Sequence, residues 1–110
     1  MPGPLAGVRV LDLTSVVLGP LATQTMGDMG ADIVKIEGPA GDTTRYTGPK
    51  RSPDMSALYM GLNRNKRSLV LDLKQDAAKD ALWRLIDTAD VLLHSIRPQA
   101  MDRLGFGHDA

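Results

Sequence analysis

The sequence has no cysteine among its 110 residues, which excludes a disulfide scaffold, a zinc site with cysteine ligands and a thiol nucleophile. It also has no excess of charge, because 13 lysine and arginine residues balance 13 aspartate and glutamate residues. A protein that coats nucleic acid would be strongly basic, so this balance argues against that class. The longest stretch without a polar residue, 16–22, is far shorter than the roughly 18 residues that a membrane-spanning helix needs.

What remains is the composition of an ordinary globular domain, with 43% hydrophobic and 24% charged residues. The length suits one compact domain. No positively charged leader precedes an apolar stretch at the N-terminus, so we expect a cytoplasmic protein. The last residues, 105–110, resemble a turn that leads into another element with Asp109 as its helix cap, which predicts that the chain is part of a longer protein.

Changes in hydrophobic period predict alternating strands and helices. Short apolar runs rich in β-branched residues predict strands at 8–14, 32–37, 68–73 and 90–96. Helical spacing predicts helices at 21–29, 76–89 and 99–104, and a single helical turn at 57–62. Residues 38–56 show no sustained period, which predicts a long loop. The order of elements predicts an α/β fold, in which an open, parallel, doubly wound sheet is flanked by helices.

Ligands of such a sheet bind beyond the carboxyl ends of its strands, here at 14–19, 37–42, 71–74 and 95–97. The first of these segments leads into a helix that we expect to begin at Pro20. Its backbone N–H groups favour an anion, although a plain strand-to-helix turn explains the same residues. Only Gly19 is present of the glycine fingerprint of dinucleotide-binding domains, so a nicotinamide dinucleotide is disfavoured.

Basic residues gather in the segment 45–67, which holds one acid, Asp54, and six bases: Arg45, Lys50, Arg51, Arg64, Lys66 and Arg67. Such a patch could meet phosphates or carboxylates through charge-assisted hydrogen bonds. A solvated loop, or ion pairs with another chain, explains the same pattern. A second basic set, Lys74, Arg97 and Arg103, would form a phosphate site if it converged at one edge of the sheet. Arg103 could instead satisfy helix-end carbonyls.

The sequence shows no arrangement typical of acid–base, nucleophilic or metal catalysis. His94 lies late in a predicted strand, and we interpret it as a packed or hydrogen-bonded residue rather than a base. Asp12 and Asp72 lie inside predicted strands. Because a buried acid needs partners, we expect both to form structural hydrogen bonds near loop backbone. No group of histidine, aspartate and glutamate residues has the spacing of a metal site.

The sequence carries several uncommon motifs in a fixed order: Pro4-Leu-Ala-Gly-Val-Arg-Val-Leu-Asp-Leu-Thr14, Gly19-Pro20, Met26-Gly-Asp-Met-Gly-Ala-Asp-Ile-Val-Lys-Ile-Glu37, Gly41-Asp-Thr-Thr-Arg45, Asn63-Arg-Asn-Lys-Arg-Ser68, Leu71-Asp-Leu-Lys74, Ala89-Asp-Val-Leu-Leu93, Arg97-Pro98 and Met101-Asp-Arg-Leu-Gly105. Together they closely resemble the start of the family III CoA-transferases. That group includes formyl-CoA transferase, carnitine CoA-transferase and α-methylacyl-CoA racemase. The resemblance extends in register over essentially the whole chain.

The resemblance implies that residues 1–110 are the N-terminal, Rossmann-like, coenzyme A-binding domain of a longer chain. It implies a homodimer of two interlocked rings, with acyl-CoA and carboxylic acids as substrates and no metal. CoA would pass between two carboxylic acids through an aspartyl-CoA thioester. The nucleophilic aspartate is expected beyond residue 110, so this chain would contain no catalytic residue and be inactive alone.

The same resemblance implies a set of CoA-binding residues. Val17 and Leu18 would lie against the thiol-bearing arm. Leu71, Asp72, Leu73 and Lys74 would contact the adenosine part. Ser95, Ile96 and Arg97 would line the adenine and phosphates, and Arg103 would reach a phosphate. The sequence also departs from the pattern it resembles. Val17 and Gly38 replace a glutamine and an arginine of the formyl-CoA transferases, and His94-Ser95-Ile96 replaces the Glu-Asn-Phe string that is usual in the family.

Three other interpretations stay open at this point. One is a CoA-dependent α-methylacyl-CoA racemase of the same family. Another is a stand-alone binding module that uses the basic segment as its contact surface. The third, a fragment of a nucleotide-dependent oxidoreductase, is weakened by the missing glycine fingerprint.

Overall fold

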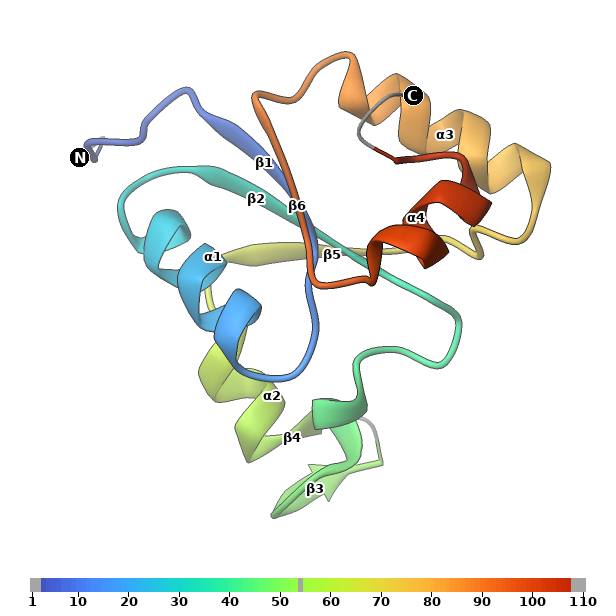
Figure 1. Ribbon diagram of the computed structural model, residues 1–110. Coiled ribbons are helices and arrows are strands. Elements are labelled where there is room, and N and C mark those ends of the chain that lie inside the picture. Colours follow the sequence, from blue (N-terminus) through green and yellow to red (C-terminus); the bar gives the residue numbers. More distant parts are fainter. Residues whose placement is uncertain (1–2, 54, 108–110) are drawn as a thin grey trace.

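A computed structural model describes residues 3–53 and 55–107 of the protein. Its centre is a parallel four-stranded sheet in the order β5-β2-β1-β6 (Figure 1). The strands are β1 (Arg9–Leu13), β2 (Asp32–Glu37), β5 (Lys66–Val70) and β6 (Val91–His94). The prediction of an open parallel α/β sheet with flanking helices is therefore confirmed.

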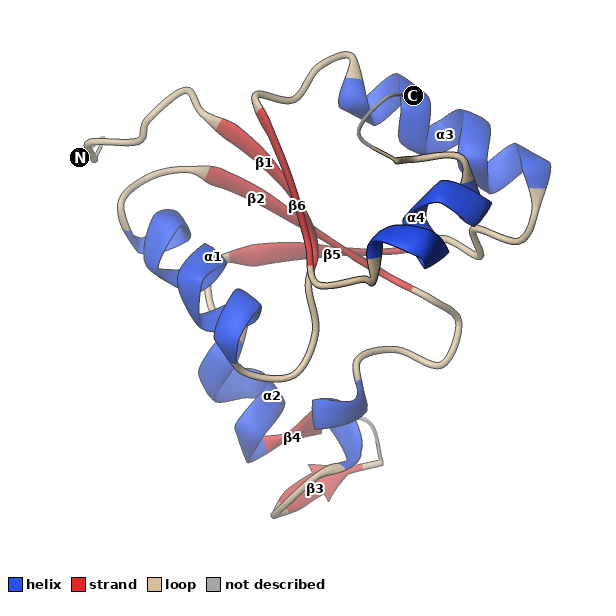
Figure 2. Ribbon diagram, viewed as in Figure 1, coloured by secondary structure: helices blue, strands red, loops and turns tan. Residues whose placement is uncertain are grey.

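The helices cover both faces of the sheet. α1 (Leu18–Asp28) and α2 (Ala57–Leu62) lie on one face, and α3 (Asp76–Ile86) and α4 (Pro98–Leu104) lie on the other (Figures 1 and 2). Within the described residues no helix is long and apolar enough to cross a membrane. Asp109, proposed as a helix cap, lies outside the described residues.

Three predicted boundaries move in the structure. α1 begins at Leu18, two residues before Pro20. The strand predicted at 68–73 is β5, which pairs with β2 from Lys66 opposite Ile33 to Val70 opposite Glu37. Because β2 ends at Glu37, residues beyond Val70 have no strand beside them and form a loop. The helix predicted at 76–89 ends at Ile86.

The prediction of one long loop over 38–56 is wrong. The segment contains a short 3₁₀ helix, η1 (Thr43–Tyr46), and an antiparallel hairpin of β3 (Lys50–Ser52) and β4 (Met55–Ser56). These elements are too short to produce a hydrophobic period, which is why the sequence pattern does not show them. They lie beside α2, away from α3 and α4 (Figure 1).

The two faces of the sheet differ in chemistry because side chains alternate along each strand. Leu11, Leu13, Val34 and Ile36 point toward α3 and α4, where they form the main apolar core with Leu82, Met101 and Phe106. The opposite face is lined by Val10, Asp12, Ile33, Lys35 and Glu37, all of which are buried. One face is thus apolar, and the other carries charged groups.

The polar face determines how α1 packs. The sequence places apolar residues on this helix at Leu21, Ala22, Met26 and Met29, and of these Met26 packs against a small apolar cluster that includes Ile33. The side chains that α1 buries most completely are instead Pro20, Thr23 and Gln24. Leu18 is 87% exposed and Leu21 is 48% exposed. Thr23 faces inward because its hydroxyl donates a 2.6 Å hydrogen bond to Asp12. α1 therefore turns a largely apolar side to the surface.

Candidate functional site

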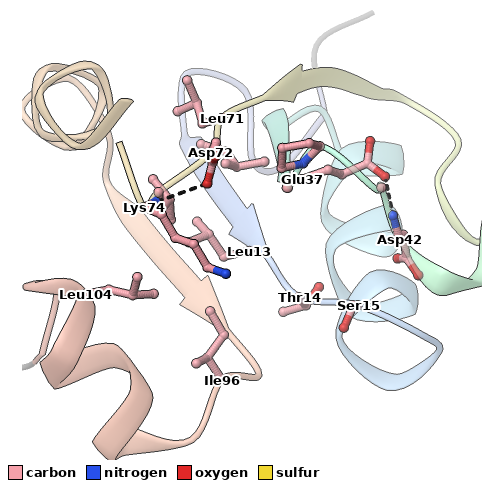
Figure 3. Close-up of a pocket in the computed structure, with 15 residues that line it drawn as sticks. Leu13, Thr14, Ser15, Glu37, Asp42, Leu71, Asp72, Lys74, Ile96 and Leu104 are labelled. Atoms are coloured by element: carbon pink, nitrogen blue, oxygen red, sulfur yellow. Dashed lines mark hydrogen bonds between the residues drawn. The ribbon is translucent and has the colours of Figure 1, made fainter. Parts of the chain in front are cut away.

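A cavity of about 380 Å³ opens at the carboxyl ends of the strands (Figure 3). The segments that follow β1, β2, β5 and β6 all contribute to its wall, and Leu104 of α4 closes one side. The chain leaves β1 toward β2 on one side and β6 lies on the other, so the strand order reverses here. Open α/β sheets bind their ligands at such a reversal.

The cavity wall combines aliphatic side chains with charged ones: the carboxylates Glu37 and Asp42, which are paired with bases of the chain, and also Asp72 and Lys74. Its apolar side chains come from four strand ends and α4: Leu13, Ile36, Leu71, Leu73, Ile96 and Leu104. The Lys74 side chain extends into the space framed by Leu13, Thr14 and Ile96 (Figure 3). The backbone N–H of Lys74 donates to Asp72 Oδ1 at 3.1 Å, which orders the turn that carries this lysine. An aliphatic wall beside an ammonium group suits a ligand with both a flat base and phosphates.

The turn after β1 has a strained backbone. Val16 has φ of 71°, in the left-handed region, where a β-branched residue is an outlier. Such a conformation costs on the order of 1–3 kcal/mol and persists only where the surroundings impose it. Here the N–H of Ser15 donates to Ser95 Oγ and the N–H of Val16 donates to Asp42 Oδ1, both at 3.3 Å. Segments after β2 and β6 therefore hold this turn from two sides.

A buried ion pair lies directly behind the turn. Lys35 Nζ is 2.9 Å from Asp42 Oδ2, and both side chains are 1% exposed. The same ammonium donates to the carbonyl oxygen of Thr14 at 3.3 Å. Burial raises the pKa of Asp42, but hydrogen bonds from Thr44 and the pairing with Lys35 outweigh it, so the pKa lies below its usual value. Asp42 is therefore held as a carboxylate.

A second buried ion pair joins β1 to β5. Lys66 Nζ is 2.9 Å from Asp12 Oδ2, and this carboxylate also accepts hydrogen bonds from Thr23 and from the Thr14 hydroxyl and N–H. Burial raises the pKa of Asp12, yet these donors hold it below its usual value. The prediction that Asp12 bonds to nearby loop backbone is confirmed by its 2.9 Å hydrogen bond with the Thr14 N–H.

A third charged group lies where β2 ends. Arg45 of η1 donates to both carboxylate oxygens of Glu37, at 2.9 and 2.7 Å, and its guanidinium stacks 3.9 Å above the Tyr59 ring. Glu37 also accepts from the Asp42 N–H at 2.8 Å. Burial raises the pKa of Glu37, but Arg45 and the backbone N–H of Asp42 bring it below its usual value. η1 is thereby fixed to the sheet.

The basic segment 45–67 is largely consumed by these contacts. Four of its six bases bind acids of the same chain: Arg45 with Glu37, Arg64 with Asp28, Lys66 with Asp12, and Arg67 with Asp32. The segment is therefore not a single basic patch facing a ligand. His94 is hydrogen-bonded as predicted, since its Nδ1 accepts the Ile96 N–H at 3.1 Å. In the part of the chain that the structure describes, no cluster of three or more histidine or acidic residues could hold a metal ion.

The structure brings together part of the predicted CoA-binding set. Five of its members line the cavity: Leu71, Asp72, Leu73, Lys74 and Ile96. The others do not: Val17 and Leu18 lie at the start of α1, Ser95 binds the Ser15 N–H, Arg97 precedes α4 and Arg103 lies in its last turn. Neither Arg97 nor Arg103 lines the cavity with Lys74.

Part of the cavity wall consists of residues at predicted strand ends that were not among the predicted CoA-binding residues. Thr14, Ser15, Gly38, Pro39 and Asp42 all line it. Their signal is position rather than residue type, because each follows a predicted strand at its carboxyl end. Leu104 gave no such signal, because it comes from a helix that packs across the opening.

The chain is similar to known proteins of one family. The model of CoA-transferase family III matches residues 5–110. Formyl-CoA:oxalate CoA-transferase of Streptomyces avermitilis is 47% identical over 111 residues, covering 99% of this chain and 27% of that protein. Succinyl-CoA:glutarate CoA-transferase of Homo sapiens is 38% identical over 107 residues, covering 96% of this chain and 24% of that protein.

Solved structures show the same relationship. The crystal structure of a CAIB/BAIF family protein from Brucella suis superposes with a TM-score of 0.92 at 32% sequence identity. The match covers 99% of this chain and 30% of that one. The chain spans about a quarter of the length of the curated relatives that it matches. It belongs to CoA-transferase family III.

Proposed function

We propose that this chain is the coenzyme A-binding part of a family III CoA-transferase, and that CoA lies across the carboxyl ends of its parallel strands. The proposal rests mainly on the cavity at the reversal of strand order, into which Lys74 extends beside aliphatic side chains. Relatives that transfer CoA between acids match the chain over nearly its whole length, which supports the same assignment.

The arrangement suggests how the parts of CoA divide over the site. The aliphatic side chains around Leu71 and Ile96 would pack against the adenine, while the Lys74 ammonium would pair with a phosphate. The thiol-bearing arm would then run toward Ser15 and the start of α1, where Val17 and Leu18 lie. Arg97 and Arg103 lie outside the cavity, so phosphate contacts by them would occur at its outer edge.

The chemical step would use groups outside this chain. An aspartate beyond residue 110 would attack the acyl-CoA carbonyl, and the CoA thiolate would leave to give a mixed anhydride. That thiolate would then attack the aspartyl carbonyl, releasing the first acid and forming the aspartyl-CoA thioester. A second carboxylate would repeat these steps in reverse and take CoA away. This chain would bind and orient CoA throughout.

Specificity for a particular acid is a separate question. The two relatives named above act on different acid pairs, formyl/oxalate and succinyl/glutarate. Val17 and Gly38 replace residues of the formyl-CoA transferases, which argues against the first pair. A homodimer and a cytoplasmic location stay predictions. The exposed apolar residues of α1 would suit burial in a larger assembly.

The test is calorimetric titration of CoA into the full-length protein that carries this chain. Wild type should bind CoA, and Lys74→Ala should weaken binding about tenfold, because one charge-assisted contact to a phosphate is lost. Arg103→Ala asks whether the predicted outer phosphate contact exists. Lys50→Ala is the control, since it removes an exposed lysine on β3 that lies outside the cavity wall. Equal affinities for wild type, Lys74→Ala and the control would refute the assignment.

A further inference from the structure

The strained turn after β1 is held by hydrogen bonds to three side chains, Lys35, Asp42 and Ser95. Lys35 donates a hydrogen bond to the Thr14 carbonyl, and Asp42 accepts one from the Val16 N–H. Because Lys35 and Asp42 form one buried ion pair, the backbone is fixed on both sides of Ser15. Close packing also restricts the backbone here. A Cβ on Gly19 would come within 2.3 Å of Thr14 Cβ, which places the first turn of α1 directly against the end of β1.

The constrained backbone of this turn exposes apolar side chains at the surface. With Val16 in the left-handed conformation, the chain turns into α1 so that Val16, Val17 and Leu18 are 49%, 44% and 87% exposed. Three consecutive apolar side chains thus stand in solvent immediately after Thr14 and Ser15, which line the cavity (Figure 3). A β-branched residue does not choose this backbone conformation by itself, so the surrounding groups must impose it.

We propose that Asp42, together with Lys35, is a positioning residue that sets the Thr14–Leu18 turn as the binding surface for the thiol-bearing arm of CoA. This inference rests on the proposed function, because it assumes that CoA occupies the cavity. Asp42 acts through the backbone of Val16 and does not contact the reacting atoms. Its carboxylate is suited to the task, since Thr44 and Lys35 fix both oxygens and the Asp42 N–H is fixed in turn by Glu37.

The first experiment compares two probes in the full-length protein: coenzyme A and adenosine 3′,5′-bisphosphate, which lacks the thiol-bearing arm. Asp42→Asn should weaken CoA about tenfold and leave the bisphosphate unchanged, because only the arm reaches the turn. A purely structural role would weaken both probes together. Asp28→Asn is the matched control, the same chemical change at an ion pair with Arg64 away from the cavity. Equal losses for both probes, or none, would overturn the proposal.

The second experiment breaks the turn from the exposed side and keeps the buried ion pair intact. Proline at position 16 cannot adopt a positive φ and has no N–H for Asp42, so Val16→Pro should reproduce the selective loss of CoA. Because Val16 is half exposed, this variant tests the proposal even if Asp42→Asn does not fold. Unchanged CoA affinity in folded Val16→Pro would contradict it.

The third experiment is a double-mutant cycle. Glycine adopts the left-handed conformation without strain, so Val16→Gly should make the turn less dependent on Asp42. The CoA affinity lost through Asp42→Asn should then be about threefold smaller in the Val16→Gly background than in wild type. Equal losses in the two backgrounds would show that Asp42 does not act through Val16. If wild type binds the bisphosphate and CoA alike poorly, the proposed function itself fails, and the inference fails with it.

Discussion

The face of the sheet beneath α3 and α4 is closed by apolar side chains, whereas the face beneath α1 and α2 buries charged ones. Figure 2 shows the two pairs of helices on opposite faces of the sheet. Apolar packing is non-directional and tolerates small shifts, so it can stabilise the fold without fixing any one atom. Buried ion pairs cost desolvation and act only in good geometry, so they are weak sources of stability but strict about position. The turns after β1 and β2 are fixed by the face with the buried ion pairs, which is the face beneath α1 and α2.

This division explains where the strain is found. The strained Val16 turn and the start of η1 both lie on the charged side. Asp42 binds the Val16 N–H and is itself paired with Lys35 of β2, and Glu37 of β2 accepts from the Asp42 N–H at the start of η1. The apolar side contributes Leu13, Ile36 and Ile96 to the cavity, which supply surface rather than orientation. One face therefore stabilises the sheet, and the other positions the loops above it.

The largest expected effect comes from breaking a pair on the charged face. Lys66→Met leaves the Asp12 carboxylate buried and unpaired, which should cost about 3–5 kcal/mol of unfolding free energy. The double variant Lys66→Met, Asp12→Leu removes both charges and should recover most of that loss. Equilibrium denaturation by urea measures both. If the double variant is as unstable as the single one, the loss does not come from an unpaired buried charge, and the ion pair itself stabilises the fold.

A slightly smaller loss is expected on the apolar face. Leu82 of α3 is fully buried in the main core, so Leu82→Ala should cost about 2–5 kcal/mol through lost contacts and the cavity left behind. Leu21→Ala on the exposed side of α1 is the matched control and should stay within about 0.5 kcal/mol of wild type. Similar losses at the two leucines would mean that α1 buries its apolar side after all.

Acid should act mainly on the charged face, because the other carboxyls with lowered pKa values, Asp28 and Asp32, belong to exposed pairs that water and salt screen. The pKa values of Asp12, Glu37 and Asp42 lie below their ordinary values of about 4, so the unfolded state binds more protons as the medium is acidified. Their contribution is fully present above the unfolded-state pKa values and is lost as pH falls through the lower folded-state values. Urea denaturation between pH 7 and pH 3 should show this decline.

The two faces can be separated within that pH series. Asp42→Asn should flatten the decline, because one of the responsible carboxylates is gone. Leu82→Ala should lower the whole curve and keep its slope, since it changes no titrating group. If the free energy of unfolding of Asp42→Asn falls with pH as steeply as that of wild type, the Asp42 carboxylate does not contribute to the acid sensitivity.

The sequence allowed the apolar face to be predicted better than the charged one. Runs such as Val8–Thr14 mark strands by residue type alone, and the parallel order follows from the alternation of elements. The packing of α1 could not be read in the same way. Helical spacing shows that its apolar residues share a side, but the side that faces inward depends on Asp12 beneath the helix, 11 residues away in sequence from Thr23.

The site divides along the same line. Strand ends such as Leu71–Lys74 could be located as a candidate cavity wall because the carboxyl ends of parallel strands meet at one edge. The partners of Lys35 and Lys66 could not be predicted, since Lys66 reaches Asp12 across two strand crossovers. Local patterns carry no information on which of several acids will lie opposite a given base. The positions of Val16 and Asp42 depend on such pairings.

The smallest effect is expected for an ion pair that belongs to neither buried face. Arg67 and Asp32 are 2.7 Å apart, but their side chains are 67% and 39% exposed, so water and salt screen their attraction. Arg67→Ala should therefore change the free energy of unfolding by at most about 1 kcal/mol, and less in high salt. Lys66→Met, one residue earlier on β5, is the comparison, and its loss should persist in high salt because that pair is buried. Comparable losses at the two neighbouring positions would contradict the view that an ion pair contributes to the free energy of unfolding because it is buried, rather than because it is charged.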